Sequence, residues 1–445
     1  MFELSQNIDS NKIFIIQFSE LEKRFDPDMV LYNRRVNSFQ YKIVPLKSLL
    51  KKQPQYGANE SGVKRNNPKE SRYIRITDIN EYGLLIDSIG VTAEQVENKY
   101  ILDDNDILFA RSGTTVGKAY LHQKENVNYK CFFAGYMIRF VVDENKILPQ
   151  YLFTYTQLTP YKEWVKSIQR AAGQPNINAE EYKALLIPLP PISTQKNIIK
   201  IINDAYAQKQ QKETQAAALL ASIDDYLLEE LGITLPEKDN SLQSRIFTTK
   251  FSELTEKWNP SFFKNRNQKI EGGIFSNYQL RGLALVEKGQ SITKEKIIDG
   301  DYPVIAGGQT SPYNHSEYNV EGDCITISAS GAYSGYVWYH SNPIFASDCS
   351  VIKSINEQII SNIFLSEVLK LKQSEIYMLQ VGAAQPHVYP NDLFKLNIPL
   401  PPLEKQTEIS KHIQNIRAQA KQLRQKVQDI LEQAKKQVEQ ILLGE

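Results

Sequence analysis

A glycine-rich segment of the first half, Gly113-Thr114-Thr115-Val116-Gly117-Lys118, has the spacing closest to a known chemical site. A phosphate-binding loop needs a glycine, four residues, Gly-Lys and then a hydroxyl that binds Mg²⁺. Here Ser112 stands at the first glycine position and Ala119 at the hydroxyl position. The matching segment from Gly331 to Gly335 is followed by Tyr336 and has no lysine. The spacing therefore argues against nucleotide binding and favours a tight turn that presents small polar side chains to a ligand.

Side chains for metal binding or catalysis are not grouped in the sequence. The five histidines are scattered without an HxxxH pair, and the three cysteines lack CxxC spacing. No Gly-x-Ser-x-Gly segment occurs. The three Asn-Pro pairs lack the second proline and the aromatic residue of amino-methyltransferase motifs. We expect no metal, no cofactor and no enzymatic activity in this chain.

Basic and hydrogen-bonding side chains of the kinds that contact phosphates and base edges occur in both halves. The candidates for DNA contacts in the first half are Lys64, Arg65, Arg72, Arg75, Arg111, Ser112, Thr114, Thr115 and Lys118. The candidates in the second half are Gln309, Thr310, Ser311, Tyr313, Asn314, Ser330 and Tyr333. A solvated surface is the alternative for any one of these runs.

Composition sets limits on the class of protein. The chain has 445 residues, of which 41% are hydrophobic, and 52 Lys and Arg nearly balance 51 Asp and Glu. This length suggests two to four globular domains, and the balanced charge means that DNA binding would rest on local patches. No apolar run is long enough for a membrane span, and the first residues do not resemble a secretion signal. Together with the unpaired cysteines, these features favour the cytoplasm.

The sequence repeats itself. Phe-Ser-Glu-Leu begins at residue 18 and again at residue 251, an offset of 233. Ile-Pro-Leu-Pro-Pro begins at residue 187 and again at residue 398, an offset of 211. The two copies therefore begin and end alike, but the second is shorter by about 22 residues in between. A shared frame with different interiors suggests the same kind of recognition applied to two targets. Duplication without divergence is the alternative.

Each copy ends in a long helix, because apolar residues recur at steps of three and four after the prolines. We expect these helices at residues 192–233 and 403–445, packed on each other as an antiparallel coiled coil if a pseudo-two-fold axis relates the halves. The alternative is that each helix packs on its own half. The residues predicted to pack are Ile198, Ile202, Leu219, Ile223, Ile409, Ile413, Ile416, Leu423 and Val427.

The remaining segments predict two α+β domains, at residues 1–191 and 245–402. Strands are indicated by β-branched and aromatic content at residues 73–76, 106–110, 136–141 and 324–327. Helices are indicated at residues 150–169 and 359–378. The predicted fold is thus α+β, with two such domains separated by two long helices in an internal repeat.

This organisation resembles the specificity subunit of type I restriction-modification systems. The resemblance rests on Gln174-Pro175-Asn176-Ile177 with Ile187-Pro188-Leu189-Pro190-Pro191 and Gln195. It rests equally on Gln385-Pro386-His387-Val388 with Ile398-Pro399-Leu400-Pro401-Pro402 and Gln406. The second copy departs from the first at Ala384 and His387, which take the places of Gly173 and Asn176.

The resemblance implies a non-catalytic protein that binds a bipartite double-stranded DNA sequence, with one target-recognition domain per half and helices that set the spacer. It also implies two methyltransferase subunits that bind S-adenosylmethionine, and in a full complex an ATP-dependent restriction subunit. Two alternatives stay open: a coiled-coil scaffold that binds proteins without DNA specificity, and a stand-alone nuclease or methyltransferase.

Overall fold

The computed structural model describes residues 15–16, 27–67, 69–86, 89–169, 175–235, 248, 269–382 and 384–445. Two units divide the chain, and each long helix contributes to both. Unit 1 comprises residues 1–212 and 425–445, and unit 2 comprises residues 213–424. Both copies of Phe-Ser-Glu-Leu lie outside the described residues, as does Gln174.

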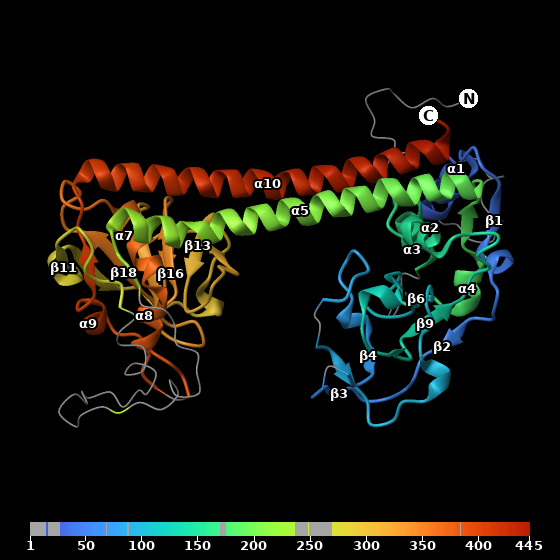
Figure 1. Cartoon of the computed structure of the whole chain (residues 1–445), viewed down its shortest axis with the longest axis horizontal. Coiled ribbons are helices and arrows are strands. Elements are labelled where there is room, and N and C mark those ends of the chain that lie inside the picture. The colour runs from blue at the N-terminus through green and yellow to red at the C-terminus, as the bar shows by residue number, and fades with distance from the viewer. Residues whose placement is uncertain are drawn as a thin grey trace. The chain divides into compact units, whose positions relative to one another are not determined.

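Unit 1 contains two four-stranded sheets. The first has the order β2-β9-β6-β7 and the second the order β3-β5-β4-β8. The strands are β2 (Gln55–Tyr56), β9 (Met137–Phe140), β6 (Ile107–Ala110), β7 (Ala119–Leu121), β3 (Val63–Lys64), β5 (Val91–Thr92), β4 (Arg72–Ile74) and β8 (Cys131–Phe133). The helices are α1 (Pro27–Asn37), α2 (Pro149–Tyr155), α3 (Thr159–Ile168) and α4 (Ala179–Ala184). Figure 1 shows α2 and α3 on one side of the first sheet and the second sheet on the other.

Unit 2 has one four-stranded sheet with the order β12-β18-β15-β16 and a three-stranded sheet with the order β14-β13-β17. The strands are β12 (Ala284–Lys288), β18 (Cys349–Ser354), β15 (Cys324–Ser328), β16 (Val337–His340), β14 (Asn314–His315), β13 (Tyr302–Ile305) and β17 (Phe345–Ala346). The helices are α7 (Asn362–Leu371), α8 (Gln373–Met378) and α9 (Pro390–Leu393). The single helices expected at 150–169 and 359–378 are therefore two helices each.

The repeated prolines form the same strand in both units. In unit 1, β10 (Leu186–Pro188) pairs antiparallel with β1 (Ile43–Pro45), and Pro188 lies opposite Ile43. In unit 2, β19 (Asn397–Pro399) pairs antiparallel with β11 (Asn277–Gln279), and Pro399 lies opposite Asn277. A short 3-10 helix follows β1 at Leu46–Leu49, and another follows β11 at Leu280–Gly282. The letter-for-letter repeat thus marks the strand that leads into each long helix.

A buried glutamine follows each proline strand and makes the same hydrogen bonds. The Gln195 carboxamide accepts from Leu148 N–H at 2.8 Å and donates to Pro190 O at 2.9 Å. The Gln406 carboxamide accepts from Ser361 N–H at 3.0 Å and donates to Pro401 O at 2.9 Å. Both side chains are fully buried. Because buried backbone groups need partners, each glutamine fixes the start of its long helix against the helical layer of its unit.

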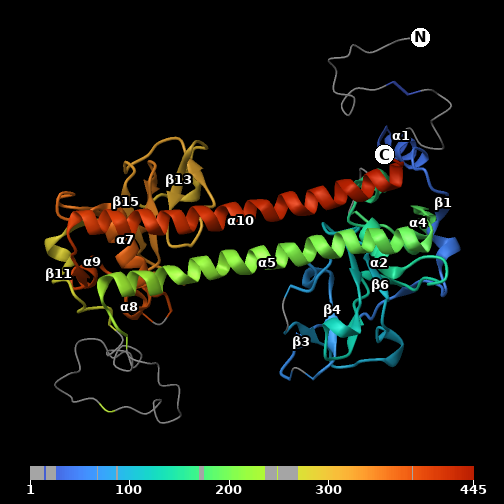
Figure 2. The ribbon, with the colours of Figure 1, turned by 45° about the horizontal axis from the view of Figure 1, so that its top comes forward.

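The long helices are α5 (Ile192–Leu231) and α10 (Leu403–Leu443). In unit 1, Ile198 and Ile202 of α5 share a hydrophobic core with Leu431 and Val438 of α10. The core of unit 2 likewise takes residues from both helices. Figure 2 shows the two helices side by side within each unit. Each helix therefore buries one face against the other helix and the adjoining domain core.

The predicted packing residues lie on these faces. Those that are buried are Ile198, Ile202, Ile223, Ile409, Ile413, Ile416 and Val427. Leu219 and Leu423 are half-buried. Towards the end of α10 the buried residues are Leu431, Ala434, Val438 and Leu442, and Ile430 and Ile441 are half-buried. The buried positions there follow steps of four from Val427 to Leu431 and again from Ala434 to Val438 and to Leu442, which turn the face relative to a strict heptad.

No helix within the described ranges is long and apolar enough to cross a membrane.

Candidate nucleic-acid interface

The first glycine turn joins β6 to β7 and is held by backbone hydrogen bonds. Gly117 N–H donates to Ala110 O at 3.0 Å, and Val116 N–H donates to Gly113 O at 3.1 Å. Gly113 N–H donates to Pro175 O at 3.1 Å, so the Gln-Pro segment lies against the turn. Gly113 and Gly117 have φ of 83° and 87°, which strongly favours glycine at both positions. The turn is therefore a rigid platform and not a phosphate cradle.

The second glycine turn, between β15 and β16, repeats these bonds. Gly335 N–H donates to Ser328 O at 2.7 Å, Ser334 N–H donates to Gly331 O at 3.0 Å, and Gly331 N–H donates to Pro386 O at 3.1 Å. One isolated bridge links Ser112 to Asn176, and its counterpart links Ser330 to His387. The two turns share a backbone, and the side chains that they carry differ.

Arg111 gives the first turn its distinctive chemistry. Its guanidinium carbon lies 5.0 Å from the centre of the Tyr56 ring, and its backbone N–H donates to Tyr136 O at 2.9 Å. The Arg111 Nε is buried and has no hydrogen-bond acceptor within the described ranges. Tyr56 is 41% exposed and Tyr136 is 65% exposed. This arrangement holds a cationic fork over the accessible ring of Tyr56, with the exposed Tyr136 on the neighbouring strand end, a combination that suits base edges and base faces.

The second turn carries Ala329 in place of Arg111 and brings a carboxylate to the corresponding strand. Ala329 N–H donates to Asp348 O at 3.1 Å, which places Asp348 where unit 1 has Tyr136. The hydroxyl of Ser330 donates to the Asp348 carboxylate. Tyr333 is 47% exposed at the tip of the turn. Ser330 itself is buried, so the second turn presents the half-buried carboxylate of Asp348 and the exposed hydroxyl of Tyr333, whereas the first presents a cation.

The remaining polar residues of the first turn differ in their availability. Thr114 is exposed, and Ser112 and Thr115 are half-buried. Lys118 donates from its Nζ to Ile79 O at 3.0 Å and so links the turn to the segment that follows β4. The hydroxyls are available to a ligand, and Lys118 also has a structural bond.

The basic cluster predicted around residue 70 is largely structural. Arg65 is 4% exposed, donates to Ile89 O at 2.8 Å and stacks on Tyr129 with 3.9 Å from its guanidinium carbon to the ring centre. Arg72 is completely buried and donates to the Tyr129 hydroxyl at 3.2 Å. Arg75 donates to both carboxylate oxygens of Asp78, at 2.8 and 3.1 Å. Only Lys64 is exposed. As contacts for DNA, Arg65 and Arg72 are excluded by burial, and Arg75 is engaged within the chain.

The candidate contact residues from Gln309 to Asn314 lie in two separate places. A side-chain hydrogen bond joins Gln309 to Tyr377, next to the second turn. Thr310 is exposed beside it. Ser311 donates to Val304 O, and it lines a separate hollow beside β14 together with Tyr313 and Asn314. The structure thus brings Gln309 towards Ser330 and Tyr333, and it sets Ser311, Tyr313 and Asn314 apart.

Sequence reasoning missed Tyr56, Tyr136 and Asp348, which complete the two turns. Each comes from a strand or strand end that is distant from its turn in the sequence, so spacing gave no signal. The strand expected at 136–141 and the Gly-rich turn were both recognised. Their pairing through β9 and β6 is what brings Tyr136 beside Arg111.

The described residues contain no cluster of three or more metal-ligating side chains, and the three cysteines are buried free thiols. Burial lowers the pKa of His122 to about 4 and, in the other unit, that of His340 to about 4. Both histidines are therefore neutral at pH 7, which fits structural roles better than proton transfer at that pH.

The chain is similar to known proteins over most of its length. The family described as "type I restriction modification DNA specificity domain" matches residues 40–221 and 275–433. The type I restriction enzyme MjaVIII specificity subunit of Methanocaldococcus jannaschii is 22% identical, over 81% of this chain and 83% of its own. The StySPI specificity subunit of Salmonella potsdam is 22% identical, over 80% and 77%.

One solved structure has a similar fold. It comes from work on complex assembly and conformational transition of a type I R-M system. The match has a TM-score of 0.54 at 14% identity, and it covers 90% of this chain and 96% of that chain.

Proposed function

Since the chain belongs to the family of type I restriction-modification DNA specificity subunits, we propose that each unit reads one half of a bipartite DNA sequence through its glycine turn. The chain is a specificity subunit and not an enzyme. One observation carries the proposal about the turns: the same backbone hydrogen bonds support Arg111 in unit 1 and Ser330 with Asp348 in unit 2. A constant frame with different side chains is what the reading of two unlike half-sites requires.

The residues at each turn suggest which base edges it prefers. Arginine forms paired hydrogen bonds with the O6 and N7 of guanine, and carboxylates accept from the N4 of cytosine. We expect Arg111, with Ser112 and Thr114, to read a guanine-containing half. We expect Asp348, with Ser330, Tyr333 and Gln309, to read a half-site whose central base presents an amino group, such as the N4 of cytosine. Thr115, Lys118, Lys64 and Thr310 are supporting contacts in this proposal.

The helices supply the connection between the two readers. We propose that residues 1–191 and 245–402 are the target-recognition domains and that residues 192–233 and 403–445 are spacers. We also propose that the spacers form an antiparallel coiled coil about a pseudo-two-fold axis. Support comes from the shared cores: the start of α5 packs with the end of α10, and the end of α5 packs with the start of α10.

Partners supply the chemistry in this proposal. Type I specificity subunits assemble with methyltransferase and restriction subunits, and we propose two methyltransferase subunits here. S-adenosylmethionine and ATP then belong to those partners, and the site of action is the cytoplasm, where the DNA lies.

Selection from a randomised duplex pool tests the proposal. The full chain is incubated with the pool, the bound fraction is sequenced, and the enriched motif is aligned. We expect two short conserved blocks separated by a spacer of fixed length and free sequence. Enrichment of a single block, or of none, contradicts the proposal and favours a protein-binding scaffold.

A further inference from the structure

A cationic cavity of about 520 Å³ lies in unit 1, away from the residues proposed above. Four basic side chains line it, Lys52, Lys99, Lys130 and Arg139, together with amides and the single carboxylate of Asp103. No aromatic ring lines the cavity, so it offers no surface on which a base could stack. Its chemistry suits a small oxyanion.

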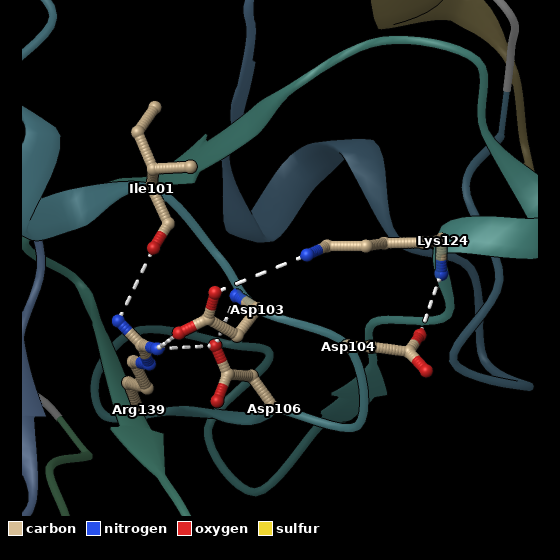
Figure 3. A network of polar contacts seen from close by, with 6 residues as sticks. All are labelled: Ile101, Asp103, Asp104, Asp106, Lys124 and Arg139. Atoms are coloured by element: carbon tan, nitrogen blue, oxygen red, sulfur yellow. Dashed lines mark hydrogen bonds and ion pairs between the residues drawn. The ribbon is translucent and has the colours of Figure 1, made fainter.

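Arg139 lines this cavity and is held by a network of polar contacts, which Figure 3 shows. It is 7% exposed, and its guanidinium donates to Ile101 O at 3.2 Å and contacts the carboxylates of Asp103 at 3.0 Å and Asp106 at 2.6 Å. Its Nε–H is buried and has no acceptor within the described ranges. The two aspartates therefore hold the side chain in place, and one donor remains unused.

The lysines supply charge that the chain itself does not neutralise. Lys52 and Lys130 are exposed, and the side chain of neither has a hydrogen bond or ion pair with any described residue. Lys99 makes an exposed ion pair with Glu97 at 2.7 Å. Exposed pairs of this kind are weak and are readily exchanged for a stronger anion.

The part of unit 2 that the structure describes has no counterpart of this arrangement. In unit 1, Arg139 of β9 lies opposite Leu108 of β6. In unit 2, the corresponding pair in β18 and β15 is Val351 opposite Thr326. The residue two positions before Thr326 is Cys324, where unit 1 has Asp106. Val351 and Cys324 are both buried in one apolar cluster. An apolar contact thus replaces the buried ion pair, and with it the wall of the cavity.

We infer that the Lys52–Lys99–Lys130–Arg139 cavity binds backbone phosphates of the DNA and that only unit 1 has such a phosphate clamp. The inference rests on the proposed function, because it assigns to the same DNA a contact that carries no sequence information. Phosphate contacts fix register and supply salt-dependent affinity. Unit 1 therefore contributes more of the salt dependence than unit 2.

The test compares K52Q/K130Q with wild type in the full chain. Binding to the selected duplex and to a scrambled duplex of equal length is measured across a salt series. If each lysine neutralises one phosphate, the slope of log affinity against log salt becomes shallower by about 1.8. The ratio of the wild-type affinity to the variant affinity then decreases roughly tenfold between about 50 and about 200 mM salt. Arg139 is not substituted, because its removal would leave the buried carboxylate of Asp106 without its ion-pair partner.

K42Q/K47Q is the matched control, since both lysines are exposed in unit 1 and neither lines the cavity. We expect its slope to stay close to that of wild type and both double variants to keep the wild-type melting temperature. An unchanged slope in K52Q/K130Q overturns the inference. So does an equal change in the control, or a shift in the selected bases. If wild type selects no motif, the proposed function fails, and the slopes on the scrambled duplex still decide whether the cavity binds phosphate.

Discussion

The two glycine turns use one backbone for different chemistry. In both, the turn is closed by the same N–H to carbonyl bonds and is backed by a proline segment. Directly after the strand that precedes the turn, unit 1 has Arg111 against Tyr56, and unit 2 has Ala329, beside the Ser330–Asp348 hydrogen bond. On this proposal, the shared backbone of the turns determines where DNA is bound, and the side chains determine which bases are recognised there.

The same contrast extends into the sheets. Unit 1 buries Arg139 with Asp106, whereas unit 2 buries Val351 near Cys324 at the corresponding positions. An ion pair and an apolar contact support equivalent strands. Burial raises the pKa of Asp106 although Arg139 partly offsets this. Because a buried ion pair contributes little net stability over an apolar substitute, its retention in unit 1 is more consistent with a binding role than with stability.

The largest expected effect tests whether the frame is shared. Gln195→Ala removes an acceptor from Leu148 N–H and donors from two carbonyls; the bond to Pro190 O is buried and the other two are partly buried. With about 1–3 kcal/mol for a buried group left unpaired and less for a partly buried one, we expect unit 1 to lose about 3 kcal/mol of stability. Gln406→Ala should cost unit 2 a similar amount. Hydrogen exchange of each unit measures both losses.

Lys196→Ala is the control for these variants, since Lys196 is the exposed neighbour of Gln195 on the same helix. We expect a change within about 0.5 kcal/mol. A cost confined to one of the two glutamine variants would show that the frames are not equivalent.

An effect of intermediate size is expected in the pH dependence of folding stability, through one buried histidine in each unit. The pKa of His122 and that of His340 are lowered to about 4 by burial, whereas an unfolded histidine has a pKa of about 6.5. As pH falls from about 6.5 towards 4, the unfolded chain binds protons that the folded chain excludes, so stability falls. The loss is at most about 3 kcal/mol per histidine.

Melting curves between pH 7.5 and pH 4.5 check this expectation. His122→Gln should flatten the pH dependence of unit 1 alone, and His340→Gln that of unit 2 alone. Stability that stays constant over this range would mean that neither histidine is held neutral by burial.

Much of the frame could be predicted from the sequence, because frames depend on local signals. The repeated Ile-Pro-Leu-Pro-Pro marks β10 and β19, the helical periodicity marks α5 and α10, and the glycine spacing marks both turns. The prediction of DNA contacts from runs of basic residues was poorer. Arg65 and Arg72 are basic and close in sequence, yet their contacts with Ile89 and Tyr129 could not be read from spacing.

The binding residues were the harder part for a physical reason. Tyr56 meets Arg111, and Lys52 and Lys130 line one cavity, only because the fold brings together strands that are distant in the sequence. Side chains gathered by non-local pairing leave no periodic pattern. A candidate site of this kind becomes visible only with the fold.

The most direct test of the central claim is sequence selection with Arg111→Ala, which gives unit 1 the residue that unit 2 has at Ala329. A well-placed arginine contributes about 1–3 kcal/mol of discrimination at one base pair. We predict that this variant loses preference at a guanine in one block of the bipartite motif and keeps the spacer and the other block unchanged. Loss of preference in both blocks together, or an unchanged motif, would contradict the account of two independent readers on a common frame.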